Sequence, residues 1–400
     1  MHRYVIIGFS FLLILLFSSL LILHFFGDIR PALLPAIQFS KEKSSTPEFQ
    51  NKADSVFIPT ESLSVDLQVI EGYQIGLFAK DIAGIRDLAF SPEGVLVGSS
   101  PSQSAIFAFK IDGKNVKRTT VVAGLTKPHG IAFFGQSLFI AENNRLSRFR
   151  WDKDTLTATF EKDILTLPSG GHDAHSIVVN RFGDLYVKVG SSCNVCNETD
   201  PMRATIIKTN TEGENPIVFA RGLRNAAFLT IDSKTDLLWA TENGRDRIGD
   251  DIPPEEVNLV KEGKNYGWPN CYGNQVLDVT FDKKNYIRNP CEDTEIPTVS
   301  MQAHSAPLGL GFIPEVFSKE FTGDLIVAFH GSWNRSVPTG YKLVRLHFEN
   351  GNFIEQTDFL TGFIRGSNAL GRPVDVEFDS LGNLFVSDDK AGAIYVISKK

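Results

Sequence analysis

Several short segments of the chain combine residue types that could carry out acid–base chemistry. One of them, residues 170–175, has the sequence GGHDAH and contains His172 and His175. A histidine can act as a general base near neutral pH, and two consecutive glycines let a backbone approach a ligand closely. A turn that carries surface histidines explains the same segment equally well. His172 is therefore a candidate base, whereas the role of His175 stays open.

Other segments could bind anions or a metal ion. In the sequence GLRN, Arg224 and Asn225 offer a fork of N–H donors and an amide to an oxygen-rich anion. The segment ENGRD at residues 242–246 is followed by four more acidic residues, Asp250, Asp251, Glu255 and Glu256. Such a density of oxygen ligands suits a hard cation, above all calcium. Acidic loops are also commonly just solvated, so this second reading stays open.

The last part of the chain adds an aromatic side chain and two more arginines. His304 lies in HSAPLGLGF, HGSWNR spans residues 330–335, and GRPV contains Arg372. Trp333 could stack against a planar ligand, although an aromatic side chain between strands more often serves packing. Arg335 and Arg372 could neutralise carboxylates.

A repeated β pattern must position these segments. Six times the sequence shows an apolar run, a short turn that often contains glycine, and a second apolar run. The six copies begin at Ile85, His129, His175, Asn225, Pro307 and Pro373. The first four begin about 44 to 50 residues apart, which is the length of a four-stranded propeller blade. The sequence therefore predicts an all-β fold, a six-bladed β-propeller of four-stranded antiparallel blades.

The segments whose residues could carry out chemistry lie between the predicted strands. Propellers bind ligands where inner-strand ends and loops converge on the central channel. Residues 247–303 are rich in Pro, Asn and Cys and show few apolar runs, so we expect a loop insertion on the binding face, with a decorative loop as the alternative. A parallel α/β fold is disfavoured because no amphipathic helical pattern separates the strand pairs.

The N-terminal region predicts export. Residues 1–26 are almost continuously apolar from Tyr4 onward and are long enough for a signal anchor, with a cleaved signal peptide as the alternative. Residues 27–59 are polar and contain prolines, which is typical of a flexible stalk. We expect the propeller over residues 60–400, outside the cytoplasm, either secreted or held at a membrane by the N-terminal helix. A net charge of −7 and a pI near 5.7 provide no positive field for nucleic acid.

The four cysteines fit an oxidising compartment. Two of them form a C-x-x-C motif, and the other two bracket a loop-like segment. We expect two disulfides rather than a zinc site, because structural zinc would favour tight spacing in both pairs. The expected disulfides are Cys193–Cys196 and Cys271–Cys291. Glycosylation sequons begin at Asn197 and Asn334, and they matter only on a eukaryotic export route.

The order of the segments resembles a known enzyme family. GGH, GLRN, ENG, the stretch EVNLVKEGKNYGWP at residues 256–269, HSAPLGL, HGSWNR and GRPVDV follow one another. Together they resemble the sorbosone dehydrogenase and fungal pyranose dehydrogenase relatives of soluble quinoprotein glucose dehydrogenase, over roughly residues 60–400. This resemblance implies a propeller that uses pyrroloquinoline quinone and calcium to oxidise an aldose, pyranose or sorbosone-like sugar. NYGWP and GLRN are its most specific parts.

The resemblance also implies roles for individual residues. His172 corresponds to the catalytic base and Arg224 to the arginine that bonds the reactive quinone oxygen. Asn225 corresponds to a second contact with the cofactor. Gly244 and Arg245 match the residues whose main-chain carbonyls hold the cofactor's calcium.

The match is incomplete on the last two blades. Arg372 fits an arginine that pairs with a quinone carboxylate, but Val374 stands where the glucose enzymes have a second arginine. HGSWNR replaces a segment in which those enzymes have a lysine, so Arg335 is a candidate replacement. Glu256 and Tyr266 align with positions that line a second, structural calcium site.

The implied reaction transfers the proton of a sugar hydroxyl to His172 and the hydride of the same carbon to the quinone. Calcium would act as a Lewis acid and Arg224 would stabilise the oxyanion, and we expect a requirement for one deprotonated group near neutrality. No C-x-x-C-H haem motif occurs, so a separate electron acceptor is expected. Two alternatives stay open: a non-catalytic extracellular recognition propeller, and a calcium-dependent lactonase that binds its metal through side chains at the channel floor.

Overall fold

The structure is a computed structural model and describes residues 65–113 and 115–400. The predicted anchor or signal peptide at residues 1–26 and the predicted stalk at residues 27–59 lie outside these residues. Between residues 65 and 400, Lys114 aside, no helix is long and apolar enough to cross a membrane. The start of the predicted propeller at residue 60 also lies outside the described part.

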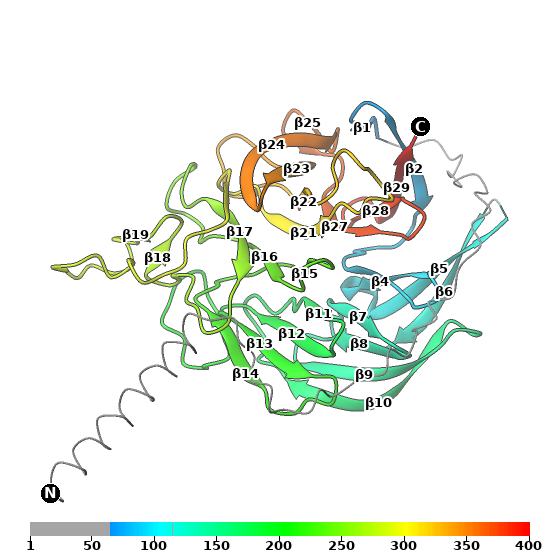
Figure 1. Ribbon diagram of the computed structural model, residues 1–400, viewed down its shortest axis with the longest axis horizontal. Coiled ribbons are helices and arrows are strands. Elements are labelled where there is room, and N and C mark those ends of the chain that lie inside the picture. Colours follow the sequence, from blue (N-terminus) through cyan, green and yellow to red (C-terminus); the bar gives the residue numbers. More distant parts are fainter. Residues whose placement is uncertain (1–64, 114) are drawn as a thin grey trace, which may run out of the picture. The chain divides into compact units, whose positions relative to one another are not determined.

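Six antiparallel sheets, the blades, surround one axis (Figure 1). Blade 1 contains β3 (Leu88–Phe90), β4 (Leu96–Ser100), β5 (Ala105–Asp112) and β6 (Asn115–Ala123). Blade 2 contains β7 (Ile131–Phe134), β8 (Ser137–Ala141), β9 (Arg145–Asp152) and β10 (Thr157–Thr166). Blade 3 contains β11 (Ile177–Val179), β12 (Asp184–Val189), β13 (Thr205–Asn210) and β14 (Ile217–Arg221).

The second half of the chain forms the other three blades. Blade 4 contains β15 (Leu229–Ile231), β16 (Leu238–Glu242), β17 (Glu255–Val260) and β20 (Val299–Met301). Blade 5 contains β21 (Pro307–Phe312), β22 (Leu325–Phe329), β23 (Lys342–Glu349), β24 (Asn352–Thr361) and an added edge strand, β1 (Gln68–Val69). Blade 6 contains β27 (Pro373–Phe378), β28 (Leu384–Asp388), β29 (Ala393–Lys399) and β2 (Tyr73–Ala79).

The two ends of the propeller are joined within blade 6. Its outer strand, β2, comes from the N-terminal side and pairs antiparallel with β29, with Tyr73 opposite Lys399 and Leu77 opposite Tyr395. The six inner strands contact one another in sequence around the axis, and β27 contacts β3. A closed ring of sheets leaves only short strand edges exposed. The predicted six-bladed fold is confirmed.

The inner strands converge so closely that side chains are restricted there. A Cβ added to Gly130, just before β7, would lie 2.5 Å from the carbonyl oxygen of His175 and 2.8 Å from the nitrogen of Ile177. Gly130 donates its N–H to that same carbonyl, which joins blades 2 and 3. Only glycine permits backbones to approach this closely.

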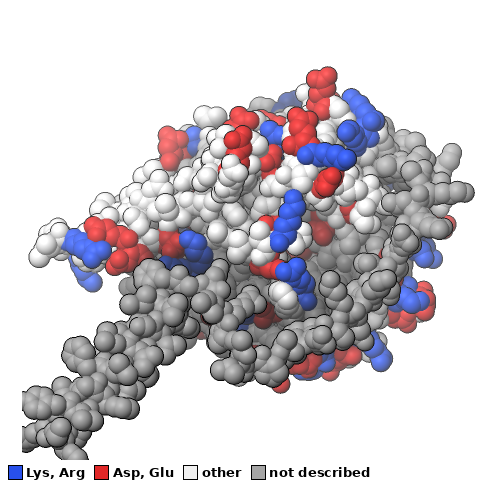
Figure 2. Space-filling view, in the orientation of Figure 1, with Lys and Arg blue, Asp and Glu red and all other residues white. Residues whose placement is uncertain are grey.

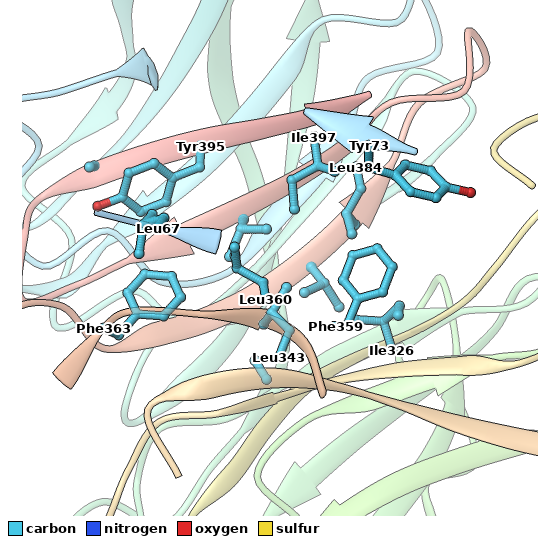
Figure 3. Close-up of a cluster of buried hydrophobic side chains, with 14 of the residues drawn as sticks. Leu67, Tyr73, Ile326, Leu343, Phe359, Leu360, Phe363, Leu384, Tyr395 and Ile397 are labelled. Atoms are coloured by element: carbon cyan, nitrogen blue, oxygen red, sulfur yellow. The ribbon is translucent and has the colours of Figure 1, made fainter. Parts of the chain in front are cut away.

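Apolar side chains fill the space between neighbouring blades. The cluster between blades 5 and 6 is drawn in Figure 3. Its labelled side chains are Leu67, Tyr73, Ile326, Leu343, Phe359, Leu360, Phe363, Leu384, Tyr395 and Ile397. Second strands such as β22 and β28 are buried on both faces, because each sheet packs against two neighbours. Burying each large apolar side chain stabilises the fold by about 1.5–3 kcal/mol.

The predicted insertion is smaller than residues 247–303, and this expectation needs correction. β17 and β20 lie inside that range and pair with each other as regular strands of blade 4. The remaining loop carries a small hairpin of β18 (Cys271–Tyr272) and β19 (Val276–Leu277). A second small hairpin, β25 (Ile364–Arg365) with β26 (Asn368–Ala369), precedes blade 6, and Pro101–Gln103 forms one turn of 3-10 helix, η1.

Both expected disulfides are present, Cys193–Cys196 and Cys271–Cys291. The first closes a loop after β12, and the second joins the small hairpin to residue 291 of the insertion. On the face shown in Figure 2, basic and acidic side chains are interspersed, so the described residues visible there carry no extended field of one sign.

Three carboxyl groups lie in the central channel, in a cavity of about 280 Å³ lined by the inner strands. Burial and then the charges of Asp375 and Glu377 hold the pKa of Asp87 well above its ordinary value. Burial raises the pKa of Asp375 to about 7, although its carboxylate accepts the N–H of Leu88. Burial and the charge of Asp375 likewise raise the pKa of Glu377. The channel is thus lined by acids that bind protons more tightly than ordinary carboxyl groups.

These acids predict a pH-dependent stability. The folded chain holds the Asp375 proton more tightly than the unfolded chain, so stability is lost as the pH rises from about 4 to about 7. Asp375→Asn removes this loss, and its free energy of unfolding should fall less than that of the wild type between pH 5 and pH 8, by roughly 1–3 kcal/mol. Denaturant unfolding at both pH values measures the difference.

The matched control is Asp293→Asn, whose parent side chain is 90% exposed. It should keep the pH dependence of the wild type. Identical pH dependence in Asp375→Asn and the wild type would show that Asp375 titrates as an ordinary surface acid.

Candidate active site

One polar cavity lies at the end of the blades where inner strands begin and second strands end. In an antiparallel sheet, the start of one strand and the end of the next lie at the same end of the sheet. The cavity has a volume of about 360 Å³. Its polar and aromatic lining residues are Arg86, His172, Arg224, Asn225, Asn243, Asp246, Glu255, His304, His330, Trp333, Asn334 and Arg372. Segments from blades 1, 3, 4, 5 and 6 therefore meet in one place.

His172 presents one ring nitrogen to this cavity. Its Nδ1 lies 3.1 Å from the carbonyl oxygen of Ser191 and 3.0 Å from the Ser191 hydroxyl. The carbonyl can only accept, which favours a proton on Nδ1 and a lone pair on Nε2. Nε2 has no hydrogen-bond partner among the described residues. Burial, followed by the charges of Arg224 and Lys188, lowers the pKa of His172 to about 3.

A buried lysine holds the loop that carries His172 by donating hydrogen bonds to its main chain. Lys188, on β12, is 1% exposed and donates from Nζ to the carbonyl oxygens of His172 and Ala174. Burial lowers the pKa of Lys188 to about 7, in spite of the opposing charge of Glu242. The sequence carries one signal for this role, a lysine within the apolar strand LYVKV.

His175 belongs to the core rather than to the cavity. It is fully buried, its Nδ1 lies 2.9 Å from the carbonyl oxygen of Lys188, and its Nε2 lies 3.3 Å from that of Asn143. Burial lowers the pKa of His175 to about 4. A neutral ring carries one N–H and can donate to only one of these two carbonyls, so His175 is a buried side chain packed between blades 2 and 3.

Arg224 uses all of its N–H groups within the protein. Its side chain is 4% exposed. Nε donates to the Asn194 carbonyl, and Nη1 donates to the carbonyls of Asn243 and Gly244 at 3.1 and 2.9 Å. Nη2 donates to the Asn194 amide oxygen and to Asp246. A ligand oxygen at Arg224 would therefore have to share or replace one of these contacts.

Asn225 and Trp333 are open to the cavity. The Asn225 backbone N–H is held by the Glu242 carboxylate, while its side-chain amide has no partner within the described residues. Trp333 is 64% exposed, and the guanidinium of Arg247 lies 5.6 Å from its ring centre. These two side chains offer an amide and an aromatic face to a ligand.

Two further arginines each keep one amino group free on the side of blades 1 and 6. Arg372 donates from Nε and Nη2 to the carbonyls of His330 and Gly331, which leaves Nη1 without a partner among the described residues. Arg86 donates from Nη1 to Asp389 and from Nε to His129, which leaves its Nη2 without a hydrogen-bond partner in the described part of the chain. Both could neutralise a ligand carboxylate.

Arg335, also predicted as a ligand of the cofactor, does not line the cavity. It donates to the carbonyls of Asp250 and Ala303 and pairs with Asp251 at 2.9 Å. It therefore holds the loop after β16 against the loop after β22. Of the two sequon residues, Asn334 lines the cavity with its amide donating to Asp246, and Asn197 is exposed.

A second, smaller cavity of about 30 Å³ lies beside the first. Its lining includes four residues singled out by the sequence, Gly244, Arg245, Glu256 and Tyr266, together with Arg224 and Glu242. Glu242 and Glu256 are both buried. Burial and the charge of Glu256 raise the pKa of Glu242, and burial raises that of Glu256. Two buried carboxyl groups facing a small space provide an environment that a cation would stabilise.

The other predicted metal residues have protein partners of their own. The Gly244 carbonyl accepts from Arg224, and its N–H donates to Glu255. The Arg245 guanidinium pairs with Asp278. The Tyr266 hydroxyl donates to the carbonyl of Leu259 and accepts the N–H of Lys261, so any contact of these residues with a cation would come through main-chain carbonyls.

Sequence reasoning missed two side chains of the cavity wall, Arg86 and, as an individual side chain, His330, and it missed Asp389, which pairs with both. His330 was singled out only as part of HGSWNR. The available signal for Arg86 is its place just before the inner strand of blade 1, where His129 and His175 stand in blades 2 and 3. Asp389 follows β28 directly, and no local pattern sets it apart from other turn aspartates.

The chain is similar in sequence to several known proteins. It is 29% identical over 362 residues to an uncharacterized protein of Borreliella burgdorferi, which covers 85% of this chain and 93% of that one. It is 26% identical over 340 residues to the pyrroloquinoline quinone-dependent pyranose dehydrogenase of Coprinopsis cinerea. That match covers 68% of this chain and 46% of the fungal enzyme, so the chain spans about half of the latter's length.

A solved structure shares the fold. The calcium structure of the Trichoderma reesei carbohydrate-active enzyme of family AA12 superimposes with a TM-score of 0.73 at 21% identity, over 85% of this chain and 100% of that one. The sequence model of the TrAA12-like family matches residues 67–400. Because this match spans all six blades and the loops that line the cavity, the chain belongs to the TrAA12-like family.

Proposed function

We propose that this chain oxidises a sugar hydroxyl with pyrroloquinoline quinone and calcium, and that His172 is the general base. One observation carries the proposal: His172 lines a cavity that arginines also line, Ser191 holds its Nδ1, and its Nε2 has no partner among the described residues. The names of the curated relatives, which include a quinone-dependent pyranose dehydrogenase, support the same reaction class. A recognition propeller would have no need for an imidazole held in this way.

The cavity fits the chemistry of the cofactor, a planar ortho-quinone with three carboxylates. The free amino groups of Arg86 and Arg372 suit carboxylates, and the Asn225 amide and the Trp333 ring suit a planar, oxygen-rich molecule. Arg224 would approach the quinone oxygen by sharing one of its present contacts. Arg335 is better explained as a clamp between loops, since its donors are engaged outside the cavity.

Calcium has two proposed places. The carbonyls of Gly244 and Arg245 would hold the ion that accompanies the cofactor, beside the buried carboxyl of Glu255. A second, structural ion would occupy the small cavity between Glu242, Glu256 and Tyr266. The calcium structure of the Trichoderma reesei relative supports the metal. Hard cations prefer carboxylate and carbonyl oxygens, which both places offer.

The residues of the chain perform the proton chemistry. His172 receives the hydroxyl proton on Nε2, and Ser191 keeps the ring oriented through Nδ1. Lys188 fixes the loop through the carbonyls of His172 and Ala174. When bound, the quinone supplies the carbonyl carbon that takes up hydride, and calcium polarises its oxygen.

The pKa of His172 in the protein without ligand lies below the neutral range in which activity is expected to require one deprotonated group. Burial and the charges of Arg224 and Lys188 lower it to about 3. A bound tricarboxylate would offset these positive charges and raise the pKa again, toward the range in which a general base works best.

A lactonase with side-chain metal ligands on the channel floor is not favoured. Among the described residues, the one group of three metal-binding side chains that lie close together is Cys193, Cys196 and Glu198, and the two cysteines form a disulfide. The channel acids Asp87 and Asp375 lie in a cavity separate from that of His172.

Export and electron transfer complete the proposal. Two disulfides are typical of proteins outside the cytoplasm, so we propose an extracytoplasmic location. The electrons are proposed to leave for a separate acceptor, because the chain carries no C-x-x-C-H haem motif.

Replacement of the base is the first test. His172→Gln should lower kcat for sugar oxidation by roughly 10²–10⁴-fold, the usual contribution of a positioned general base, with cofactor affinity retained. The assay reconstitutes the protein with calcium and the quinone and follows aldose oxidation by absorbance. His347→Gln is the control, because His347 lies on β23 outside the cavity; His175→Ala is unsuitable, since His175 is fully buried. Full activity of His172→Gln would remove the base assignment.

The same residue gives a second readout. In the protein without cofactor, the imidazole of His172 should stay neutral from pH 8 down to about pH 4, because its pKa is lowered to about 3. A histidine-selective NMR titration measures this. A protonation midpoint near the ordinary value would contradict the electrostatic environment described for the cavity.

Substitution of Arg224 tests its network. Arg224→Lys keeps the charge, but an ammonium group has three donors in place of five and lacks the planar fork. We expect a lower thermal midpoint and at least about tenfold weaker quinone binding, since the loops that carry Gly244 and Asp246 lose contacts. Equal loss of quinone affinity in Arg335→Lys, the matched control, would place Arg335 in the cofactor site.

Calcium addition tests the small cavity. Calcium at 100 times its Kd should stabilise the protein by about 2.7 kcal/mol. Glu256→Gln should remove most of that gain, because it removes one of the two buried carboxylates. Thermal unfolding with calcium and with a chelator measures the gain. Glu295→Gln, at a carboxylate that pairs with Lys261 and Lys264, should retain it. An undiminished gain in Glu256→Gln would exclude this cavity as the calcium site.

A further inference from the structure

A second imidazole lines the cavity that contains His172. His330 follows β22 directly, and its Nε2 lies 3.0 and 3.1 Å from the two carboxylate oxygens of Asp389. The backbone on either side is also held, because Arg372 donates to the carbonyls of His330 and Gly331. Ring and main chain of His330 therefore have one defined position.

Asp389 is an ionised carboxylate in this arrangement. It pairs with Arg86 at 2.6 Å and with His330, and these partners lower its pKa to about 2 even though burial acts in the opposite direction. The preceding residue, Asp388, accepts the N–H groups of Arg372, Lys390 and Ala391, which fixes the turn. The position of the carboxylate thus depends on the turn after β28 and on an arginine of blade 1.

The carboxylate determines which ring nitrogen of His330 carries the proton. An ionised carboxylate can only accept hydrogen bonds, so Nε2 of His330 must be the N–H donor. Burial lowers the pKa of His330, which leaves the ring neutral at pH 7 and Nδ1 with a lone pair. Nδ1 has no hydrogen-bond partner among the described residues, and it is not one of the buried unpaired atoms, which include Nδ1 of His129.

We propose that His330 Nδ1 accepts a hydrogen bond from a second hydroxyl of the substrate, one that does not react. This inference rests on the proposed function and names its substrate class: a polyhydroxy compound with one hydroxyl at His172 and another at His330. The remaining polar groups on this wall, the free amino groups of Arg86 and Arg372, are donors and suit ligand oxygens that accept. An unpaired imidazole acceptor is complementary to an O–H group.

A site with this hydrogen bond would bind sugars more tightly than simple alcohols. A ligand without the second hydroxyl leaves Nδ1 desolvated and unpaired, and sites built for a hydroxyl discriminate strongly against analogues that lack it. Asp389 is a positioning residue, because it acts through the proton on Nε2. Asp389→Asn can donate an amide N–H to Nε2, which moves the proton to Nδ1 and turns the acceptor into a donor.

The first experiment measures the tautomer and needs no cofactor. Purified full-length protein carrying ¹⁵N-labelled histidine is examined by long-range ¹H–¹⁵N NMR at pH 8. We expect His330 with a protonated Nε2 and a bare Nδ1 in the wild type, and the reverse in Asp389→Asn. His347, whose Nδ1 and Nε2 face the carboxylates of Asp324 and Glu349, should give the same signals in both proteins and is the internal reference. The same tautomer of His330 in both proteins overturns the role of Asp389.

The second experiment measures recognition. His330→Leu, reconstituted with calcium and the quinone, should raise KM for the preferred aldose about tenfold or more, with kcat within a fewfold of the wild type. His330→Gln should recover part of the loss through its amide oxygen, and His347→Gln should leave KM unchanged. One monodeoxy form of the sugar should lose affinity for the wild type and lose nothing further with His330→Leu.

The outcomes separate this inference from the proposed function. If the wild type oxidises no sugar, the proposed function fails, and the inferred sugar contact fails with it even where NMR shows the expected tautomer. If the wild type oxidises sugars and His330→Leu leaves every KM unchanged, only the inference about His330 fails. If His330→Leu instead weakens quinone binding in an absorbance titration, His330 contacts the cofactor and the sugar contact is wrong.

Discussion

The pairing of β2 with β29 closes the propeller, and the geometry of the cavity depends on it. An N-terminal strand completes the sheet formed by the last three strands of the chain, with Tyr73 opposite Lys399. Once the ring is closed, the beginning of every inner strand points to one axis. Loops that are distant in the sequence then meet around one cavity, and residues such as Arg86 and Asp389, 303 positions apart, form an ion pair. Without the closure, blade 1 and blade 6 would share no wall.

The cavity concentrates charged groups that are largely buried, and the best-placed of them have partners that keep them in a defined state. Arg224 donates five hydrogen bonds to the loops of blades 3 and 4. Asp389 remains ionised between Arg86 and His330. His172 and His330 stay neutral because burial and nearby positive charges oppose their protonation. Low dielectric surroundings strengthen each of these contacts, so one substitution is expected to disturb several groups at once.

Arg224 shows how resemblance and geometry complement each other. The GLRN segment identified it as a residue that touches the ligand, and the structure does place it in the wall of the cavity. Its guanidinium also carries the carbonyl of Gly244 and the carboxylate of Asp246. The same side chain is therefore part of the framework that positions the proposed calcium ligands, a role that a motif four residues long does not reveal.

The sequence by itself determined the number of blades, their four-stranded form, both disulfides and most of the cavity residues. These features are local: apolar runs, turn glycines and short segments before inner strands recur in the same order in every blade, and a strand's place in a blade follows from that order. The tertiary structure decided what each polar side chain faces. It placed Arg335 outside the cavity and His175 in the core, and it brought Asp389 to His330. Hydrogen-bond partners across a ring of blades come from segments far apart in the chain, so no local pattern records which nitrogen of an imidazole is held and which is free.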